Sequence, residues 1–481
     1  MTGARRGPGP RPTGGRGDKL PRPPRGRRPS IDPAREAAYE AISAVHTDDA
    51  YANLLLPRVL RERGVTGRDA AFATELAYGT LRMSGTLDTI VAAAADREVE
   101  RIDPPVRDAL RLGAYQLLYT RVAAHGATAT TVDLVRSLVP GAAGFANAVL
   151  RRVGERPIDD WLAALAPPYA DDPIGHLALA HAHPPWIVRA LLDSLGGSME
   201  ELSAALAADN APPAVQLCAR PGRITAAELA AQSGGSVGRW SPYAVTLEGG
   251  PPGSIPALAR RLAHVQDEGS QLVAAALAAA PVSGNPPQRW LDLCAGPGGK
   301  AGLLGALAEQ QGATLTAVDV SEHRAALVAQ AVRGLPVEVV TADGREVGRH
   351  EALPEATFDR VLVDAPCTGL GALRRRPEAR WRKAPSDLPP LTRLQRELLG
   401  AALRAVRPGG VVAYVTCSPH QVETRVSVHE ALRRSAIEVE PVDARPLLPG
   451  VPGLGDGPDV QLWPHRHGTD AMYLSLLRRL P

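Results

Sequence analysis

Cysteine is scarce in this chain, because 481 residues include only Cys218, Cys294, Cys367 and Cys417. Their spacing fits neither a metal site nor a disulfide framework, so we expect no bound metal and a reducing, cytoplasmic compartment. Long apolar runs are missing too: no stretch of about 18 residues is apolar and uncharged, which predicts no transmembrane helix. The charged N-terminus has no apolar segment after it, so no secretory signal is expected.

Lysine is rarer still, since only Lys19, Lys300 and Lys383 occur among 54 positively charged side chains. Either Lys300 arises by chance or its position requires a compact ammonium that arginine cannot replace. Residues 1–30 contain nine Arg and Lys and one Asp, whereas the whole chain has a net charge of only +3. The remainder is therefore slightly acidic, and any nucleic-acid surface on it must be local.

The length predicts about three domains. Residues 1–30 are rich in Pro, Gly and Arg and lack apolar residues, which predicts a disordered basic tail, either simply solvated or a nucleic-acid tether. Residues 31–155 repeat apolar side chains at helical spacing throughout, which predicts an all-α domain. Residues 156–285 mix helical and short strand patterns, as in a small α+β domain. Residues 286–481 alternate apolar strands with amphipathic helices, which predicts an α/β, Rossmann-like domain with a parallel sheet.

Candidate ligand-binding residues follow the strands of this last domain, and ligands of such sheets bind at the carboxyl ends of the strands. The first strand ends in "LDLCAGPGGKAGLL", where glycines precede a helix N-terminus and permit close approach of a ligand. The next three strands end at Asp319, Asp343 and Asp364. These acids suit ribose hydroxyls and an adenine amino group. Because the dinucleotide fingerprint is absent, the pattern favours S-adenosylmethionine over NAD.

Two cysteines also follow strands: Cys367 comes after Asp364, and Cys417 ends "VVAYVTC". If these strands are parallel neighbours, both thiols lie over one cleft, whereas Cys218 and Cys294 suit inert core positions. A methyl donor, a thiolate and a carboxylate together suit cytosine C5 methylation, in which the thiolate adds to C6 and activates C5. The carboxylate would hold N3 and the exocyclic amine. The spacing does not decide which thiol attacks.

The segments "LDLCAGPGGK", "VDVSEHR", "FDRVLVDAPCTGLGALRRRPEARW" and "YVTCSPHQVE" resemble motifs of the Sun/Fmu family of RNA cytosine-5 methyltransferases, and "VQDEGSQLVA" resembles the segment before its catalytic domain. The helical region, including "RLGAYQLLYTRVAAHGATATTVDLVRS", resembles the RNA-binding factor NusB. A NusB-like domain joined to this catalytic domain is typical of bacterial small-subunit (16S) ribosomal RNA methyltransferases. The resemblance implies S-adenosylmethionine as cofactor and ribosomal RNA as partner, and nothing demands more than a monomer.

The resemblance also implies residue roles. Cys417 would be the nucleophile, Cys367 the cysteine that releases the product, and Asp364 would face the cytosine. The chain departs from the family at Val422-Glu423-Thr424, where Glu-Glu-Asn is usual. The implied cofactor-binding residues are Cys294, Ala295, Gly296, Pro297, Gly298, Gly299, Lys300, Asp319, Asp343 and Asp364.

A cationic run follows Cys367. We expect its side chains to hold RNA phosphates and Trp381 to stack on a base, although such a run is more often a solvated face. Two other functions compete with a cytosine methyltransferase: a non-catalytic RNA-binding or antitermination factor, and a methyltransferase for another RNA, another nucleobase or a protein. The predicted phosphate-binding residues are Arg374, Arg375, Arg376, Arg380, Arg382 and Lys383.

Overall fold

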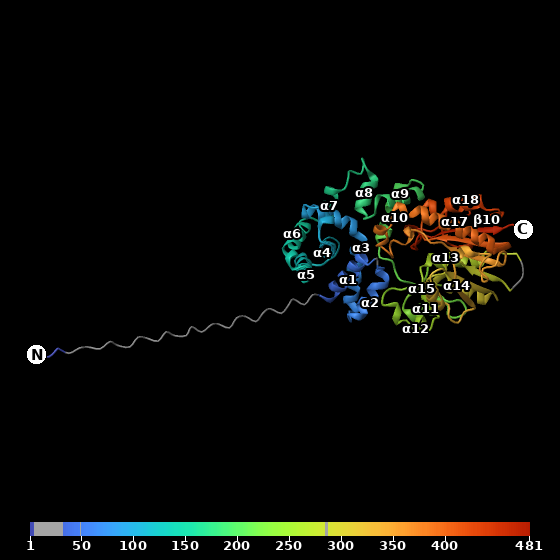
Figure 1. The fold of residues 1–481 in the computed structure, drawn as a ribbon, viewed down its shortest axis with the longest axis horizontal. Helices are drawn as coiled ribbons and strands as arrows, with labels where there is room; N and C mark the ends of the chain where they lie inside the picture. The colour runs from blue at the N-terminus through green and yellow to red at the C-terminus, as the bar shows by residue number, and fades with distance from the viewer. Residues whose placement is uncertain (4–31, 49, 284–286) are drawn as a thin grey trace.

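The computed structural model describes residues 1–3, 32–48, 50–283 and 287–481. The predicted basic tail, apart from its first three residues, lies outside the described residues. The described part of the chain is elongated, with a helical bundle at one end and a large sheet at the other (Figure 1).

The helical bundle is built around one long central helix, α3, whose buried Leu76, Leu81 and Leu87 contribute to the largest apolar cluster of this region. The Asp32 carboxylate begins the first helix by accepting a hydrogen bond from the N–H of Arg35 at 2.9 Å, a standard N-cap. The bundle confirms the all-α prediction. Its helices are α1 (Pro33–Thr47), α2 (Ala52–Glu62), α3 (Gly67–Ala95), α4 (Pro104–Tyr119), α5 (Ala124–Leu138), α6 (Ala143–Val153) and α7 (Ile158–Leu165).

The middle region contains five helices and a small antiparallel sheet with the strand order β2-β3-β1-β4. Both strands predicted from "AVQLCAR" and "YAVTLEG" are present, as β1 and β3, so the expected α+β composition is confirmed. The elements are α8 (Pro173–Ala180), α9 (Pro185–Ser194), α10 (Met199–Asn210), β1 (Gln216–Ala219), α11 (Ala226–Ser233), β2 (Ser236–Val237), β3 (Ala244–Thr246), α12 (Pro256–Ala259) and β4 (Ala263–Val265).

The large sheet has the order β10-β12-β9-β8-β5-β6-β7, with the short strand β11 beside β12. Strands β5 to β9 are mutually parallel, and the strands after them join antiparallel. Helices cover both faces, which confirms the predicted Rossmann-like fold. The elements are α13 (Glu268–Ala279), β5 (Arg289–Asp292), α14 (Gly299–Gln310), β6 (Thr314–Asp319), α15 (Glu322–Ala331), β7 (Val337–Thr341), β8 (Phe358–Asp364), α16 (Ala379–Arg382), α17 (Leu388–Ala405), β9 (Val406–Thr416), α18 (Arg425–Arg434), β10 (Val439–Val442), β11 (Val460–Gln461), α19 (Pro464–His467) and β12 (Tyr473–Arg479).

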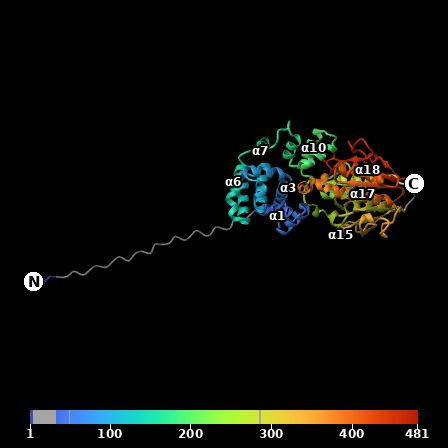
Figure 2. The same cartoon turned by 45° about the horizontal axis from the view of Figure 1, so that its top comes forward.

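The chain order reverses at β5, because β6 pairs with one edge of this strand and β8 with the other. A crevice at the carboxyl ends of the strands is expected at such a switch point. Helices α8 to α10 pack beside this edge, since their apolar side chains share a cluster with Leu370 and Leu373, which follow β8. Figure 2 shows α3 on the side of the bundle that faces the sheet.

Candidate active site

The loop between β5 and α14 lies against the end of β6. Asp319 accepts a hydrogen bond from the N–H of Gly296 at 3.0 Å, and a Cβ at Gly296 would lie 2.4 Å from an Asp319 oxygen. Gly298 has a φ of +109°, and its Cβ would lie 2.6 Å from that of Ala331. Both positions therefore require glycine for steric reasons, and the loop presents backbone at the N-terminus of α14.

Lys300 lies on the first turn of α14, and its ammonium donates to Asp364 at the end of β8 over 2.7 Å. Burial lowers the pKa of Lys300, but the charge and hydrogen bond of Asp364 outweigh it, so the net shift is upward. The side chain is only 12% exposed. A buried place beside a carboxylate suits the compact ammonium, and the requirement for lysine at this position stays a prediction.

Asp292 ends β5 and is a site residue that the sequence reasoning missed. It is fully buried; its Oδ1 accepts from the N–H of Cys294 at 3.3 Å, and its Oδ2 has no hydrogen-bond partner. Burial and then the charge of Asp364 raise the pKa of Asp292 to about 7. The sequence carried the signal, since Asp292 stands at a strand end as Asp319 and Asp364 do.

Asp343 follows β7 and differs from the other acids in that both of its described partners come from one residue, Arg345, two positions further along the chain. It accepts from the N–H of Arg345 at 2.9 Å and pairs with its guanidinium at 2.6 Å. These contacts lower the pKa of Asp343. Its predicted contact with a cofactor stays a prediction.

The structure brings the two predicted thiols together. Strands β8 and β9 are parallel neighbours, and the Sγ atoms of Cys367 and Cys417 lie 3.5 Å apart beyond their ends. The hydrogen bond between the two thiols, together with the positive charges of Lys300 and Arg376, lowers the pKa of Cys417 despite burial and the charge of Asp364. The same hydrogen bond, together with burial, raises the pKa of Cys367. Cys417 is thus the thiol more readily ionised.

Most side chains of the cationic run after Cys367 contact other parts of the protein, where the sequence predicted contacts with RNA phosphates. Arg374 is 7% exposed and bridges Asp267 and Asp470, each at 3.0 Å, and Arg375 joins the same two carboxylates at 2.8 and 3.0 Å. These pairs attach the segment after Cys367 to the start of α13 and to the loop before β12. Arg374 is buried against protein carboxylates, so its predicted phosphate contact is wrong. Arg375 is half-buried on the same carboxylates, and its predicted phosphate contact stays a prediction.

The next part of the run anchors α16 in the other two regions. Arg380 is fully buried and donates to Asn210 at 2.7 Å and to the carbonyls of Ala182 and Asp209 at 3.1 and 2.9 Å. The indole N–H of Trp381 donates to the carbonyl of Leu81 on α3 at 3.0 Å, and its ring packs on the bundle. The predicted roles of Arg380 and Trp381 in RNA contact are therefore wrong.

Three members of the run remain. Arg382 donates to the carbonyls of Val45 and Ala50, so it also joins the catalytic domain to the bundle. Arg376 is exposed and Lys383 half-buried. The predicted phosphate contacts of Arg376 and Lys383 stay predictions.

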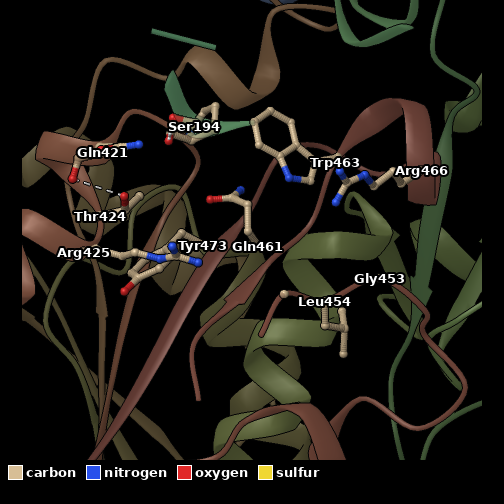
Figure 3. A pocket seen from close by; sticks show the side chains of 12 residues that line it. Ser194, Gln421, Thr424, Arg425, Gly453, Leu454, Gln461, Trp463, Arg466 and Tyr473 are labelled. Atoms are coloured by element: carbon tan, nitrogen blue, oxygen red, sulfur yellow. Dashed lines mark hydrogen bonds between the residues drawn. The ribbon is translucent and has the colours of Figure 1, made fainter. Parts of the chain in front are cut away.

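A hollow of about 510 Å³, open to solvent, lies beside the loop that follows Cys417. Gln421, Thr424 and Arg425 lie on one side of it, and Trp463 and Arg466 on the other (Figure 3). Neither thiol lines it. Within the described part of the chain, no cluster of His, Cys, Asp or Glu could hold a metal ion, and no helix there is long and apolar enough to cross a membrane.

Comparisons with known proteins agree with this arrangement. Residues 279–478 match the family model described as 16S rRNA methyltransferase RsmB/F, and residues 32–155 match the NusB family. The ribosomal RNA small subunit methyltransferase B of Pseudomonas putida is 33% identical, over 93% of this chain and 98% of that protein. The chain belongs to the RsmB/F family of methyltransferases. Membership confirms the methyltransferase class and the family that the motifs predicted.

Two further comparisons extend over nearly the whole chain. The protein named "Putative methyltransferase Rv1407" of Mycobacterium tuberculosis is 58% identical, over 94% of this chain and 98% of its own length. The crystal structure of PH0851 has the same fold, with a TM-score of 0.77 at 24% identity, and covers 93% of this chain and 99% of its own. This RsmB/F member thus shares its domain arrangement with relatives of full length. The predicted domain boundaries near residues 155 and 285 stay predictions.

Proposed function

We propose that this protein methylates C5 of a cytosine in 16S ribosomal RNA, using S-adenosylmethionine and a covalent intermediate on Cys417. The observation that carries the proposal is the pair of thiols 3.5 Å apart beside the Lys300–Asp364 ion pair. The P. putida relative is named as a small-subunit ribosomal RNA methyltransferase, which supports the substrate. A non-catalytic RNA-binding protein would have no use for two thiols arranged in this way.

The residues around the glycine loop fit S-adenosylmethionine. Asp292 has an orphaned carboxylate oxygen in a buried place, which suits a cationic ligand, and the glycines leave open backbone next to Asp319. We assign the cofactor to the loop 294–300 together with Asp292, Asp319 and Asp343. When bound, the cofactor supplies an electrophilic methyl group.

The thiols and the ion pair then supply the remaining chemistry. The Cys417 thiolate, favoured by Lys300 and Arg376, forms a bond to C6 of cytosine and makes C5 nucleophilic. Asp364 accepts a hydrogen bond from the exocyclic amine of the base, and the ammonium of Lys300 paired with it offsets the negative charge that develops at N3. After C5 has taken the methyl group, a base removes the C5 proton and the bond between Cys417 and C6 breaks, which returns Cys417 to the thiolate; Cys367, beside that sulfur, assists this release. The target base must leave any stacked helix to reach this site.

Covalent trapping tests this proposal. Cys367→Ala and Cys417→Ala proteins are each incubated with S-adenosylmethionine and unmodified 16S ribosomal RNA and run on a denaturing gel, with the double variant as control. We expect an RNA adduct with Cys367→Ala only. An adduct with Cys417→Ala alone would reverse the two roles, and no adduct, with no 5-methylcytosine formed by the wild type, would refute the reaction. Bisulfite sequencing of the product identifies the methylated position.

A further inference from the structure

Both thiols are followed at once by a hydroxyl residue, and both hydroxyls point to one buried carboxylate. Thr368 follows Cys367, and Ser418 follows Cys417. Glu423, which lies in the short turn before α18, is fully buried between them. The sequence singled out Glu423 as the one acid kept where the family usually has two.

The carboxylate of Glu423 accepts four hydrogen bonds. Its Oε1 accepts from the N–H of Thr368 at 2.8 Å and from the side-chain amide of Gln395 at 3.1 Å. Its Oε2 accepts from the hydroxyl of Ser418 at 2.7 Å and from that of Thr368. Thr368, Ser418 and Gln395 are each at most 2% exposed, so water does not compete for these bonds.

The network also fixes its own members. Gln395, on α17, donates to the carbonyl of Pro366 at 2.9 Å, just before Cys367. The phenol of Tyr414 on β9 donates to the carbonyl of Glu423 at 2.8 Å, which fixes the turn against the strand that leads to Cys417. The carboxylate of Glu423 therefore joins the loop that carries Cys367 to the loop that carries Cys417.

We infer that Glu423 is a positioning residue that sets the distance and orientation between the Cys367 and Cys417 thiols by holding Thr368 and Ser418 on one carboxylate. The two loops also meet directly, because the hydroxyls of Thr368 and Ser418 lie 3.2 Å apart and the N–H of Gly371 donates to the carbonyl of Cys417 at 2.9 Å. Among the described side chains, Glu423 is the one that makes hydrogen bonds to both Thr368 and Ser418 and so orients both hydroxyls. A buried ionised acceptor gives strong and directional bonds, which suits the fixing of two chain segments. Glu423 acts through the loops and does not itself touch the reacting atoms.

The inference rests on the proposed two-thiol reaction, but its principal test needs no RNA. Dibromobimane fluoresces strongly once it has alkylated two neighbouring thiols, so its rate reports how the thiols lie relative to each other. We expect Glu423→Ala to slow cross-linking about tenfold or more, while Glu430→Gln, which removes a half-buried carboxylate on α18 that pairs with Arg433, reacts as the wild type. The single variants Cys367→Ala and Cys417→Ala give no cross-link and define the background.

Kinetics separate positioning from general damage. In Glu423→Ala, we expect kcat to fall about 100-fold, as for a reacting group misplaced by about 1 Å, with the KM for S-adenosylmethionine changed less than about threefold. Glu423→Gln keeps one acceptor oxygen and lets both hydroxyls turn, so it restores most of the cross-linking rate and of kcat. If Glu423→Ala does not fold, the double variant Thr368→Val/Ser418→Ala replaces it with the same expectations.

A folded Glu423→Ala, or the double variant in its place, that cross-links at the wild-type rate overturns the inference. The inference is also overturned if Glu423→Gln loses as much activity as Glu423→Ala. If the wild type cross-links readily and Glu423→Ala does not, but no RNA adduct forms in the trapping experiment, then the proposed reaction fails while the positioning of the thiols stands.

Discussion

Replacing Trp381 with alanine tests whether the cationic run anchors the domains or binds RNA. The indole packs on the bundle and donates to the carbonyl of Leu81. Truncation of a buried Trp costs about 3–5 kcal/mol, and the loss of its hydrogen bond is part of that cost. Because the ring is partly exposed, we expect the low end, about 3 kcal/mol, for Trp381→Ala.

Gly85 on α3 offers the matching perturbation from the other side. A Cβ there would lie 2.3 Å from Cη2 of Trp381. In the wild type, Gly85→Ala should therefore cost about 1–3 kcal/mol through overpacking. In the Trp381→Ala background the clash is gone, and the same substitution should be neutral or stabilise the helix by up to about 1 kcal/mol. The two changes should thus be coupled by about 2 kcal/mol.

The assay is urea unfolding followed by circular dichroism, with hydrogen exchange of the α3 amides as the local readout. Gly144→Ala on α6 is the control, since its Cβ would meet no atom within 4 Å and its effect should not depend on Trp381. Additive effects of Gly85→Ala and Trp381→Ala would refute the anchoring. Wild-type stability with weakened RNA binding in Trp381→Ala would restore the base-stacking role.

Three further predictions concern the active site. Burial and Asp364 raise the pKa of Asp292 to about 7, so the protonated carboxyl favours the folded state. This stabilisation is fully present below about pH 4 and is lost as the pH rises to about 7, a loss on the order of 4 kcal/mol. Asp292→Asn should remove this loss from the pH dependence of the unfolding free energy measured in urea. Lys300→Arg should lower kcat at least about tenfold, because the larger guanidinium displaces Asp364 from the base; unchanged steady-state kinetics would contradict this. Arg376→Gln should reduce the slope of log Kd for RNA against log salt by about 1, whereas Arg374→Gln should leave the slope unchanged and lower the unfolding free energy by about 3–5 kcal/mol.

The sequence alone determined the fold class, the order of the regions and the position of the thiols. These features depend on local pattern: helical periodicity gives the bundle, and alternating strands and helices give a parallel sheet. A residue that ends one of the parallel strands must lie at the same edge as the residues that end the others. Cys367 and Cys417 therefore met as expected. The ion pair between Lys300 and Asp364 was not predicted and is seen only in the structure.

Only the tertiary structure decided what the cationic run does. "ALRRRPEARWRK" reads the same whether its side chains face solvent, RNA or protein. The acceptors that hold Arg380 come from residues 182, 209 and 210, far away in the sequence. Burial depends on which distant segments pack together, and no local pattern encodes that.

For the same reason, the sequence alone assigned no role to Asp292 and Glu423, the two acids whose surroundings only the structure shows. Asp292 became notable through an oxygen without a partner, and Glu423 through donors supplied by two loops and a helix. Residue type and spacing located both of them near the site. Their roles follow from the hydrogen bonds that each carboxylate makes or lacks, and those exist only once β8, β9 and α17 have packed together.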